Sequence, residues 1–222
     1  MRGRKKIPDI RAAILGCAAE VFAQREFHEV LTEDIAARLG IGKGTIYRYF
    51  DSKEALYFAT IVEGLAGMHD AVTAALHQPA PVAAVIERLV ETVLTYFWTR
   101  RDFFILLHRH EPTLDPRERA EWQQQREELV AEVQRILFSA LPRGSLGRQH
   151  PRLTVEILFG MMRSASLYRS AADRLPTLAK LITAMFLTGI SGQSANGKPR
   201  THPRRALPRR RSQALRGGLS HS

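Results

Sequence analysis

Apolar residues recur along most of the chain at spacings of three and four, which is the period of an α-helix with one buried face. No stretch alternates apolar and polar residues over the length of a strand. Pro, Gly and polar clusters divide the helical pattern into segments. The sequence therefore predicts an all-α protein of about nine helices, at residues 9–23, 32–39, 43–50, 52–76, 82–98, 101–110, 116–141, 152–170 and 176–190.

The stretch 31–56 is the most sharply punctuated part of this pattern. Thr32 precedes two acidic residues, so its hydroxyl is expected to cap the helix that follows. Gly40 and Gly42 bracket Ile41 and predict a tight turn with one buried apolar side chain. A helix, a turn containing Gly and a second helix make a helix-turn-helix, in which the second helix enters the DNA major groove.

A helical wheel for residues 43–50 shows which side chains can face DNA. Ile46 and Phe50 fall together and are expected to face the core, while small and polar residues fall opposite them. The candidate base readers are Gly44, Thr45 and Arg48. The other DNA-contacting candidates are Tyr47 and Tyr49 on the flanks, Lys43 and Lys53 at helix starts, and Thr32.

The helix after this motif is expected to begin near Ser52, with Asp51 as its cap and Glu54 completing a capping box. Its apolar spacing continues to Leu76 without a Pro, and about 24 residues at 1.5 Å each make a rod of about 36 Å. This helix is long enough to leave the DNA-binding helices and enter a second domain. The expected division is 1–55 for the N-terminal arm and helix-turn-helix, 56–192 for a helical domain, and 193–222 for a disordered basic tail.

A helix-turn-helix pattern alone also occurs as an ordinary packed helical corner. The string GIGKGTIYRYFDSKEAL, however, closely resembles the signature of the TetR family of bacterial transcription regulators, and the resemblance extends over residues 7–58. It implies that Thr45, Tyr47, Tyr49 and Lys53 occupy DNA-contacting positions. The chain departs from the family pattern at Gly42, where Ser is common, and at Tyr49, where His is more usual.

The resemblance also implies a second domain that binds a small-molecule effector and forms a homodimer. Aromatic and polar residues on the helices that surround the family's effector cavity suit a hydrophobic ligand, although aromatics at this spacing also form ordinary cores. The effector candidates are Phe97, Phe104, His108, Trp122, Phe159, Met162 and Tyr168. The last two helices are expected to pair with their twins in a four-helix bundle, through Leu158, Met161, Ala165, Leu178, Ile182 and Met185, which in a monomer would be core.

The net charge of +11 is that of a nucleic-acid binder, but its distribution changes its meaning. Residues 1–6 carry four basic residues and residues 191–222 carry eight, and neither end carries an acid. Residues 7–190 therefore have a net charge of −1. The tail is expected either to hold the protein near DNA without reading sequence, or to be a solvated extension.

Several other patterns in the sequence carry no chemistry. The segment GIGKGT lacks the Lys directly before Ser or Thr that a phosphate-binding loop needs. His108 and His110 stand two apart, a spacing that does not bring them together on a helix, and Cys17 is a single cysteine at a core position. We expect no enzymatic activity, metal or cofactor, no membrane contact and a cytoplasmic location.

The sequence thus predicts a ligand-responsive homodimeric transcription regulator, a repressor rather than an activator, that an effector releases from an inverted-repeat DNA operator. The rival interpretation is an α-helical protein that sequesters a small molecule or a partner and no longer reads DNA. Gly42 and Tyr49 are the residues that support the rival.

Overall fold

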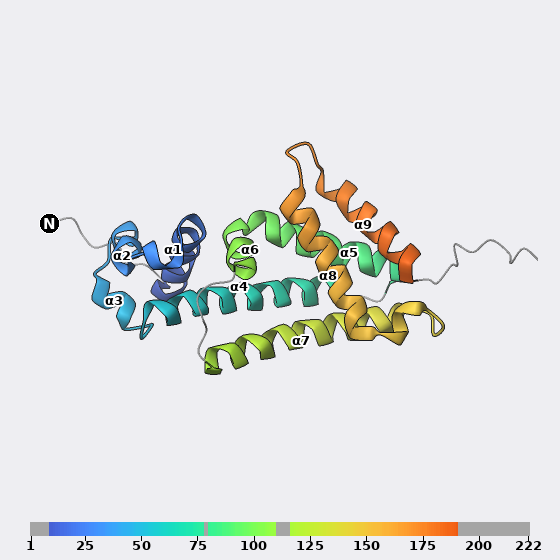
Figure 1. Ribbon diagram of the computed structural model, residues 1–222, viewed down its shortest axis with the longest axis horizontal. Helices are drawn as coiled ribbons and strands as arrows, with labels where there is room; N and C mark the ends of the chain where they lie inside the picture. The colour runs from blue at the N-terminus through green and yellow to red at the C-terminus, as the bar shows by residue number, and fades with distance from the viewer. Residues whose placement is uncertain (1–8, 78–79, 110–115, 191–222) are drawn as a thin grey trace, which may run out of the picture. The chain divides into compact units, whose positions relative to one another are not determined.

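The computed structural model describes residues 9–77, 80–109 and 116–190. These ranges form nine α-helices and two short 3-10 helices, with no strand among them. The helices are α1 (Ile10–Gln24), α2 (Thr32–Leu39), α3 (Lys43–Tyr47), α4 (Lys53–Leu76), α5 (Val82–Thr99), α6 (Arg101–His108), α7 (Pro116–Ala140), α8 (Pro151–Tyr168) and α9 (Leu175–Ile190) (Figure 1). The all-α prediction is confirmed over these ranges, and the basic arm and the tail lie outside them.

The first three helices enclose a small apolar core. Ile14 and Phe22 from α1, Ile35 from α2 and Ile46 from α3 are all buried in it. Leu56 and Tyr57 from α4 and Leu106 from α6 complete the same cluster. The core of the helix-turn-helix therefore continues past residue 55 and uses side chains from the helices that follow.

The N-cap residue was predicted correctly for the start of α1 but not for the start of α4. Asp9 accepts a hydrogen bond from the Ala12 N–H at 2.9 Å and caps α1, at the residue where that helix was predicted to begin. At α4 the prediction of Asp51 as the cap is wrong, because the Ser52 Oγ accepts the Ala55 N–H at 3.0 Å. The Ser52 hydroxyl, one residue after Asp51, thus accepts from a backbone N–H of the first turn that has no partner within the helix.

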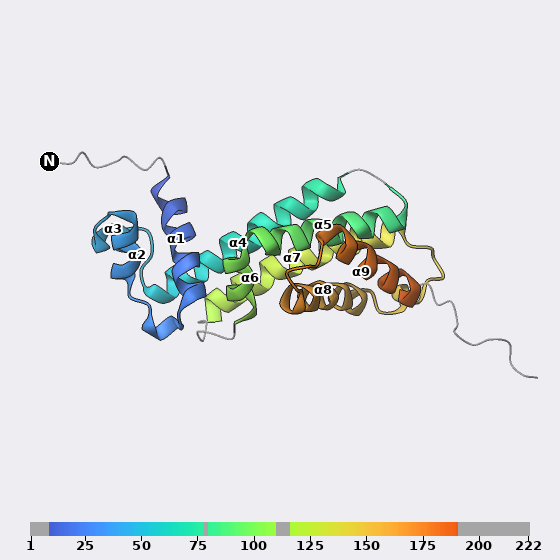
Figure 2. The same cartoon turned by 90° about the horizontal axis from the view of Figure 1, so that it is seen from above.

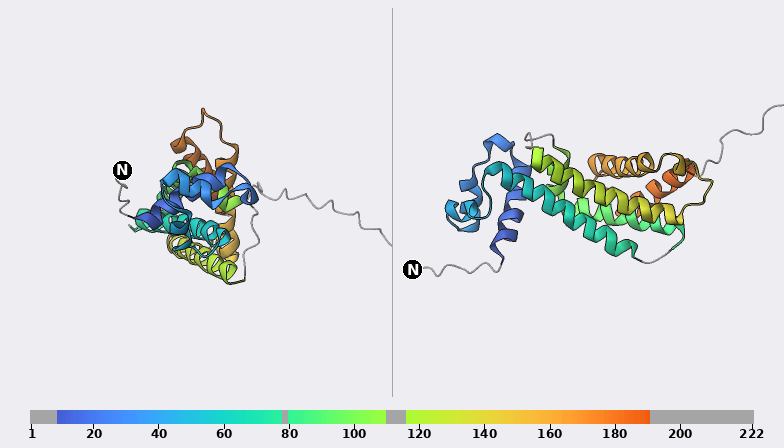
Figure 3. Two further views of the ribbon diagram at one scale, coloured as in Figure 1. Left: turned by 90° about the vertical axis from the view of Figure 1, so that its left-hand side faces the viewer. Right: turned by 90° about the horizontal axis from the view of Figure 1, so that it is seen from below.

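A larger apolar core lies among α4, α5, α7, α8 and α9. α4 runs from the small core into this one, and α7 packs along it (Figures 2 and 3). α6 packs against α1 and α4, between the two cores. Gly64 of α4 allows this approach, because a Cβ placed there would lie 2.0 Å from the ring of Phe103 in α6.

Candidate functional site

The turn between α2 and α3 has the geometry that its glycines predicted. Gly40 takes a left-handed conformation with φ of 65°, and its N–H bonds back to the carbonyls of Ala36 and Ala37. Gly42 stands at the N-cap of α3 and has no side chain to bond there. α3 is short, ending at Tyr47 rather than at the predicted Phe50, since Arg48 already belongs to its C-cap.

The orientation of α3 agrees with the helical wheel. Ile46 and Phe50 are buried at 1% and 5% exposure. Gly44 and Arg48 are exposed and Thr45 is partly exposed, while Tyr47 and Tyr49 are the exposed aromatics of this segment. The predicted base readers therefore face solvent, and their contact with DNA stays a prediction.

Residues of α2 hold the outer side chains of α3 in place. The Lys43 Nζ donates to the Glu33 Oε1 at 2.5 Å, and this bond lowers the pKa of the Glu33 carboxyl. The Tyr47 hydroxyl lies 3.2 Å from the Thr32 Oγ1. Thr32 is buried and is the first residue of α2, and Leu31 stands at the N-cap. The prediction that Thr32 caps this helix is therefore wrong. Its hydroxyl instead donates to Glu33 and meets Tyr47.

Lys53, at the start of α4, binds the segment between α1 and α2. Its Nζ donates to the carbonyls of Phe27 and Val30, at 2.9 Å and 3.1 Å, and lies 4.3 Å from the centre of the Phe27 ring. Two of its three N–H groups are therefore committed within the chain. The predicted phosphate contact would have to use the third.

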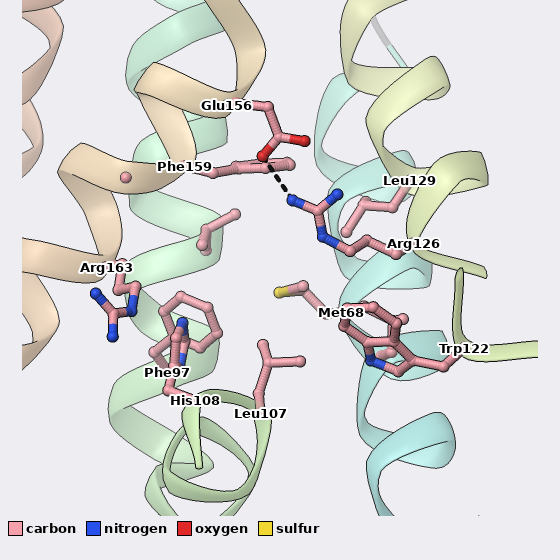
Figure 4. Close-up of a pocket in the computed structure, with 13 residues that line it drawn as sticks. Met68, Phe97, Leu107, His108, Trp122, Arg126, Leu129, Glu156, Phe159 and Arg163 are labelled. Atoms are coloured by element: carbon pink, nitrogen blue, oxygen red, sulfur yellow. Dashed lines mark hydrogen bonds and ion pairs between the residues drawn. The ribbon is translucent and has the colours of Figure 1, made fainter. Parts of the chain in front are cut away.

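A cavity of about 320 Å³ opens among α4, α5, α6, α7 and α8 (Figure 4). Four of the seven effector candidates line it, namely Phe97, His108, Trp122 and Phe159. The other three do not: Phe104 and Met162 are buried in the core, and Tyr168 is 85% exposed at the end of α8. Periodicity alone cannot distinguish a core aromatic from one beside a cavity.

The sequence interpretation missed the charged residues of this cavity. Arg126 of α7 and Glu156 of α8 form an ion pair across it, with the Arg126 Nη2 2.5 Å from the Glu156 Oε2. Arg163 of α8 also lines it. Arg126 and Glu156 are 30 residues apart in sequence, so no local pattern signalled their pairing.

His108 lies at the α6 side of the cavity. Its Nδ1 is 2.8 Å from the Phe104 carbonyl oxygen, and its ring packs against Phe97 and Phe104. Burial lowers the pKa of His108, and although the hydrogen bond to the Phe104 carbonyl opposes this, the nearby Arg163 guanidinium adds to the lowering. The neutral ring is favoured, with the proton on Nδ1, because a carbonyl oxygen can only accept a hydrogen bond.

The next residue, Arg109, joins α6 to the end of α1. Its Nη1 donates to the carbonyls of Phe22 at 2.7 Å and Arg25 at 2.8 Å, and its Nη2 donates to that of Ala23 at 3.3 Å. These carbonyls belong to the last turn of α1, where a helix lacks internal partners and attracts a cation. No pattern in the sequence had signalled this role of Arg109. A side chain on the cavity wall thus stands next to one that holds the DNA-binding helices.

An exposed apolar face runs along α8 and α9. Leu153, Ile157, Leu181 and Met185 are each more than half exposed. Of the predicted interface residues, Met185 belongs to this face, and Met161, Ala165 and Leu178 are partly buried. Leu158 and Ile182 are buried at 0% and 4% in the chain's own core, so their assignment to an interface is wrong. Both helices are apolar on more than one side, which made the outward side hard to choose.

No helix of residues 9–77, 80–109 and 116–190 is long and apolar enough to cross a membrane. Over the same ranges no three His, Cys, Asp or Glu side chains gather as metal ligands would.

Comparison with known proteins gives matches over both cores. The model of the bacterial regulatory proteins of the tetR family matches residues 14–60, and that of the tetracyclin repressor-like C-terminal domain matches residues 79–189. The HTH-type transcriptional repressor Rv3405c of Mycobacterium tuberculosis is 35% identical over 92 residues, which are 40% of this chain and 46% of that one. The match thus spans less than half of that relative. The HTH-type transcriptional regulator EthR of Mycolicibacterium smegmatis is 25% identical over 85% of this chain and 89% of its own length.

Solved structures share the fold over most of the chain. A TetR-family transcriptional regulator from Bordetella parapertussis matches with a TM-score of 0.70 and 24% identity, covering 82% of this chain and 96% of that one. FadR from Bacillus subtilis in complex with stearoyl-CoA matches with a TM-score of 0.69 and 17% identity, covering 81% and 98%. Since the two family models together cover the helix-turn-helix and the helices from α5 to α9, the chain belongs to the TetR family of bacterial transcription regulators.

Proposed function

We propose that this protein is a homodimeric transcription repressor that a small molecule releases from an inverted-repeat operator. The observation that carries the proposal is the orientation of α3, which buries Ile46 and Phe50 and turns Gly44, Thr45 and Arg48 outward. A small residue lets the backbone approach base edges, and an Arg can donate two hydrogen bonds to a guanine. The repressor Rv3405c, which is similar over 92 residues, supports repression over activation.

The exposed apolar face of α8 and α9 supports the homodimer. Ile157 and Met185 of this helix pair are exposed to water, and covering them with a second copy of the chain would stabilise the assembly. Two recognition helices related by a two-fold axis then meet two half-sites about one turn of DNA apart.

The path from ligand to DNA runs through α6 and α4. A ligand in the cavity meets His108, and the adjacent Arg109 holds three carbonyls at the end of α1. Displacement of α6 or α4 would change the separation of the two recognition helices. A 100-fold loss of operator affinity needs about 2.7 kcal/mol of coupling, within the usual range for allostery. FadR, which has the same fold, is solved in complex with stearoyl-CoA, and this supports the binding of a ligand by a protein of this fold.

The test of DNA reading is fluorescence anisotropy with duplexes from the region upstream of the gene. Arg48→Ala should weaken the specific duplex by about 1–3 kcal/mol and relax base preference at one position. Lys43→Ala should weaken all duplexes alike and reduce the salt slope by about one. Equal affinity of the wild type for every duplex would contradict the proposal and favour the rival, a helical sequestering protein.

The test of the dimer is the molar mass in solution by light scattering. Met185→Glu places a charge on the exposed face and should give monomers. Ala131→Glu, on the exposed side of α7, is the matched control and should keep the wild-type mass. A monomeric wild type would contradict the proposed assembly.

A further inference from the structure

The charged lining of the cavity is unequal in sign. Arg126 and Arg163 are cations and Glu156 is the acid among the described lining residues (Figure 4). Arg163 has no ion-pair partner in the described parts of the chain. His108 adds no further charge while its ring is neutral. The lining therefore has an excess of one positive charge, which favours an anion over a cation.

The pair of Arg126 and Glu156 shows how an anion could be held. Their side chains are 32% and 28% exposed, so they face the cavity without being sealed from it. A guanidinium binds any carboxylate through the same planar set of donors. The Glu156 carboxylate thus occupies the place beside Arg126 that the carboxylate of a ligand would take.

A neighbouring residue would allow Glu156 to leave. Arg152, one turn earlier on α8, has its Nη2 3.7 Å from the Glu156 Oε1 and also bonds Glu127. If the carboxylate of a ligand replaced Glu156 beside Arg126, Glu156 would still have Arg152 as a cationic partner. The replacement would therefore avoid leaving a partly buried carboxylate unpaired, which costs free energy.

The rest of the wall is apolar. Leu65, Met68, Val93, Phe97 and Leu129 are buried side chains that line the cavity. A site of this kind takes up an apolar body and orients it through a few polar groups.

We propose that the ligand is an organic acid, with one carboxylate bound by Arg126 in place of Glu156 and an apolar body against the α4, α5 and α7 walls. The proposal rests on the assignment of this cavity as the effector site. It narrows the effector from a hydrophobic molecule to an apolar acid, and it gives Arg126 the role of choosing it.

The test compares three probes with one chain and different heads: decanoate, 1-decanol and decylamine. Titration calorimetry on the full-length protein should show decanoate binding at least tenfold tighter than the other two. Arg126→Gln should remove that preference while decanol still binds, which also shows that the cavity is intact. The matched control is Arg135→Gln, also on α7 but paired with Glu132 away from this cavity, and it should keep the preference.

A second variant covers the case in which Arg126→Gln does not fold. Glu156→Gln removes the internal competitor and should bind decanoate several-fold tighter than the wild type does. Equal or weaker binding of decanoate by this variant would overturn the proposal. So would wild-type protein that binds decanol or decylamine as well as decanoate, or that does not bind decanoate.

DNA release is measured separately, by anisotropy with each probe. If decanoate bound with the expected preference but the protein stayed on DNA, the result would support the ligand class and contradict the regulatory role of the cavity. If decanol released the protein from DNA as readily as decanoate did, the regulatory role of the cavity would stand, but the proposal that its ligand is an organic acid would be overturned.

Discussion

The DNA-facing surface and the cavity each hold a basic side chain against an acid of a neighbouring helix, but the two pairs differ in burial. Lys43 and Glu33 are 49% and 53% exposed, whereas Arg126 and Glu156 are 32% and 28% exposed. Water and salt screen the first pair, so a DNA phosphate can replace Glu33 at little cost. The second pair lies between apolar walls, where exchange requires a ligand that fits the cavity. The same kind of ion pair is thus expected to exchange its acid readily at the DNA-facing surface and selectively in the cavity.

The two regions communicate only if the contact between them is stiff. We call this contact the seam, meaning Gly64 of α4 against Phe103 of α6, and Arg109 against the last turn of α1. The predictions below first break the seam and then alter each region in turn.

Gly64→Ala should have the largest effect. Its Cβ would lie 2.0 Å from the Phe103 ring, which is 2% exposed and has little room to move. Overpacking of this kind should lower the free energy of unfolding by about 3 kcal/mol in urea denaturation. Gly16→Ala is the matched control, because it lies in α1 with nothing within 4 Å of the new Cβ. That change should raise stability by about 0.5–1 kcal/mol. A neutral Gly64→Ala would show that the seam is loose.

Arg109→Ala should come next. It removes charged donors from three carbonyls of α1, and should lower the free energy of unfolding by about 2 kcal/mol. Ligand binding should also change DNA affinity less than in the wild type. The control is Arg101→Ala, an exposed position at the other end of α6, where the free energy of unfolding should stay within about 0.5 kcal/mol of the wild-type value. An unchanged response to ligand would mean that α4 alone carries the signal.

His108 gives the cavity a dependence of stability on pH. The pKa of His108 is lowered in the folded protein, so the unfolded chain binds this proton first as the pH falls. The stabilisation is complete above the pKa of the unfolded histidine, about 6.5, and is lost below it. The melting temperature should therefore fall less between pH 7.5 and 5.5 in His108→Gln than in the wild type. His150→Gln, an exposed histidine, should retain the wild-type slope in differential scanning fluorimetry.

Glu33→Gln should have the smallest effect. It frees Lys43 from its present partner, so affinity should rise about threefold for all duplexes alike, with a steeper salt dependence. Glu128→Gln makes the same change of charge on an exposed part of α7 and should change affinity less. A gain confined to one duplex would show that Glu33 takes part in reading sequence.

The features that the sequence predicted well are local ones. Each helix boundary lies within about three residues of its predicted place, since periodicity and Pro or Gly punctuation act over a few residues. The inward side of segment 43–50 was also predicted, because Ile46 and Phe50 are the apolar side chains that fall together in an otherwise polar stretch.

The features that it did not predict depend on distant partners. Arg109 binds carbonyls 84 to 87 residues earlier in the chain, and Arg126 pairs with a residue on another helix. Leu158 and Ile182 were assigned to the wrong side because α8 and α9 have more than one apolar side. Only the assembled helices decide which of these sides is covered.

The acceptors of Arg109 have a consequence for how this protein can evolve. They are backbone carbonyls, which every amino acid supplies, so substitutions on the outer side of α1 leave the bond to α6 intact. The cavity-lining residue 108 and the contact that residue 109 makes with α1 can therefore be altered separately by substitution.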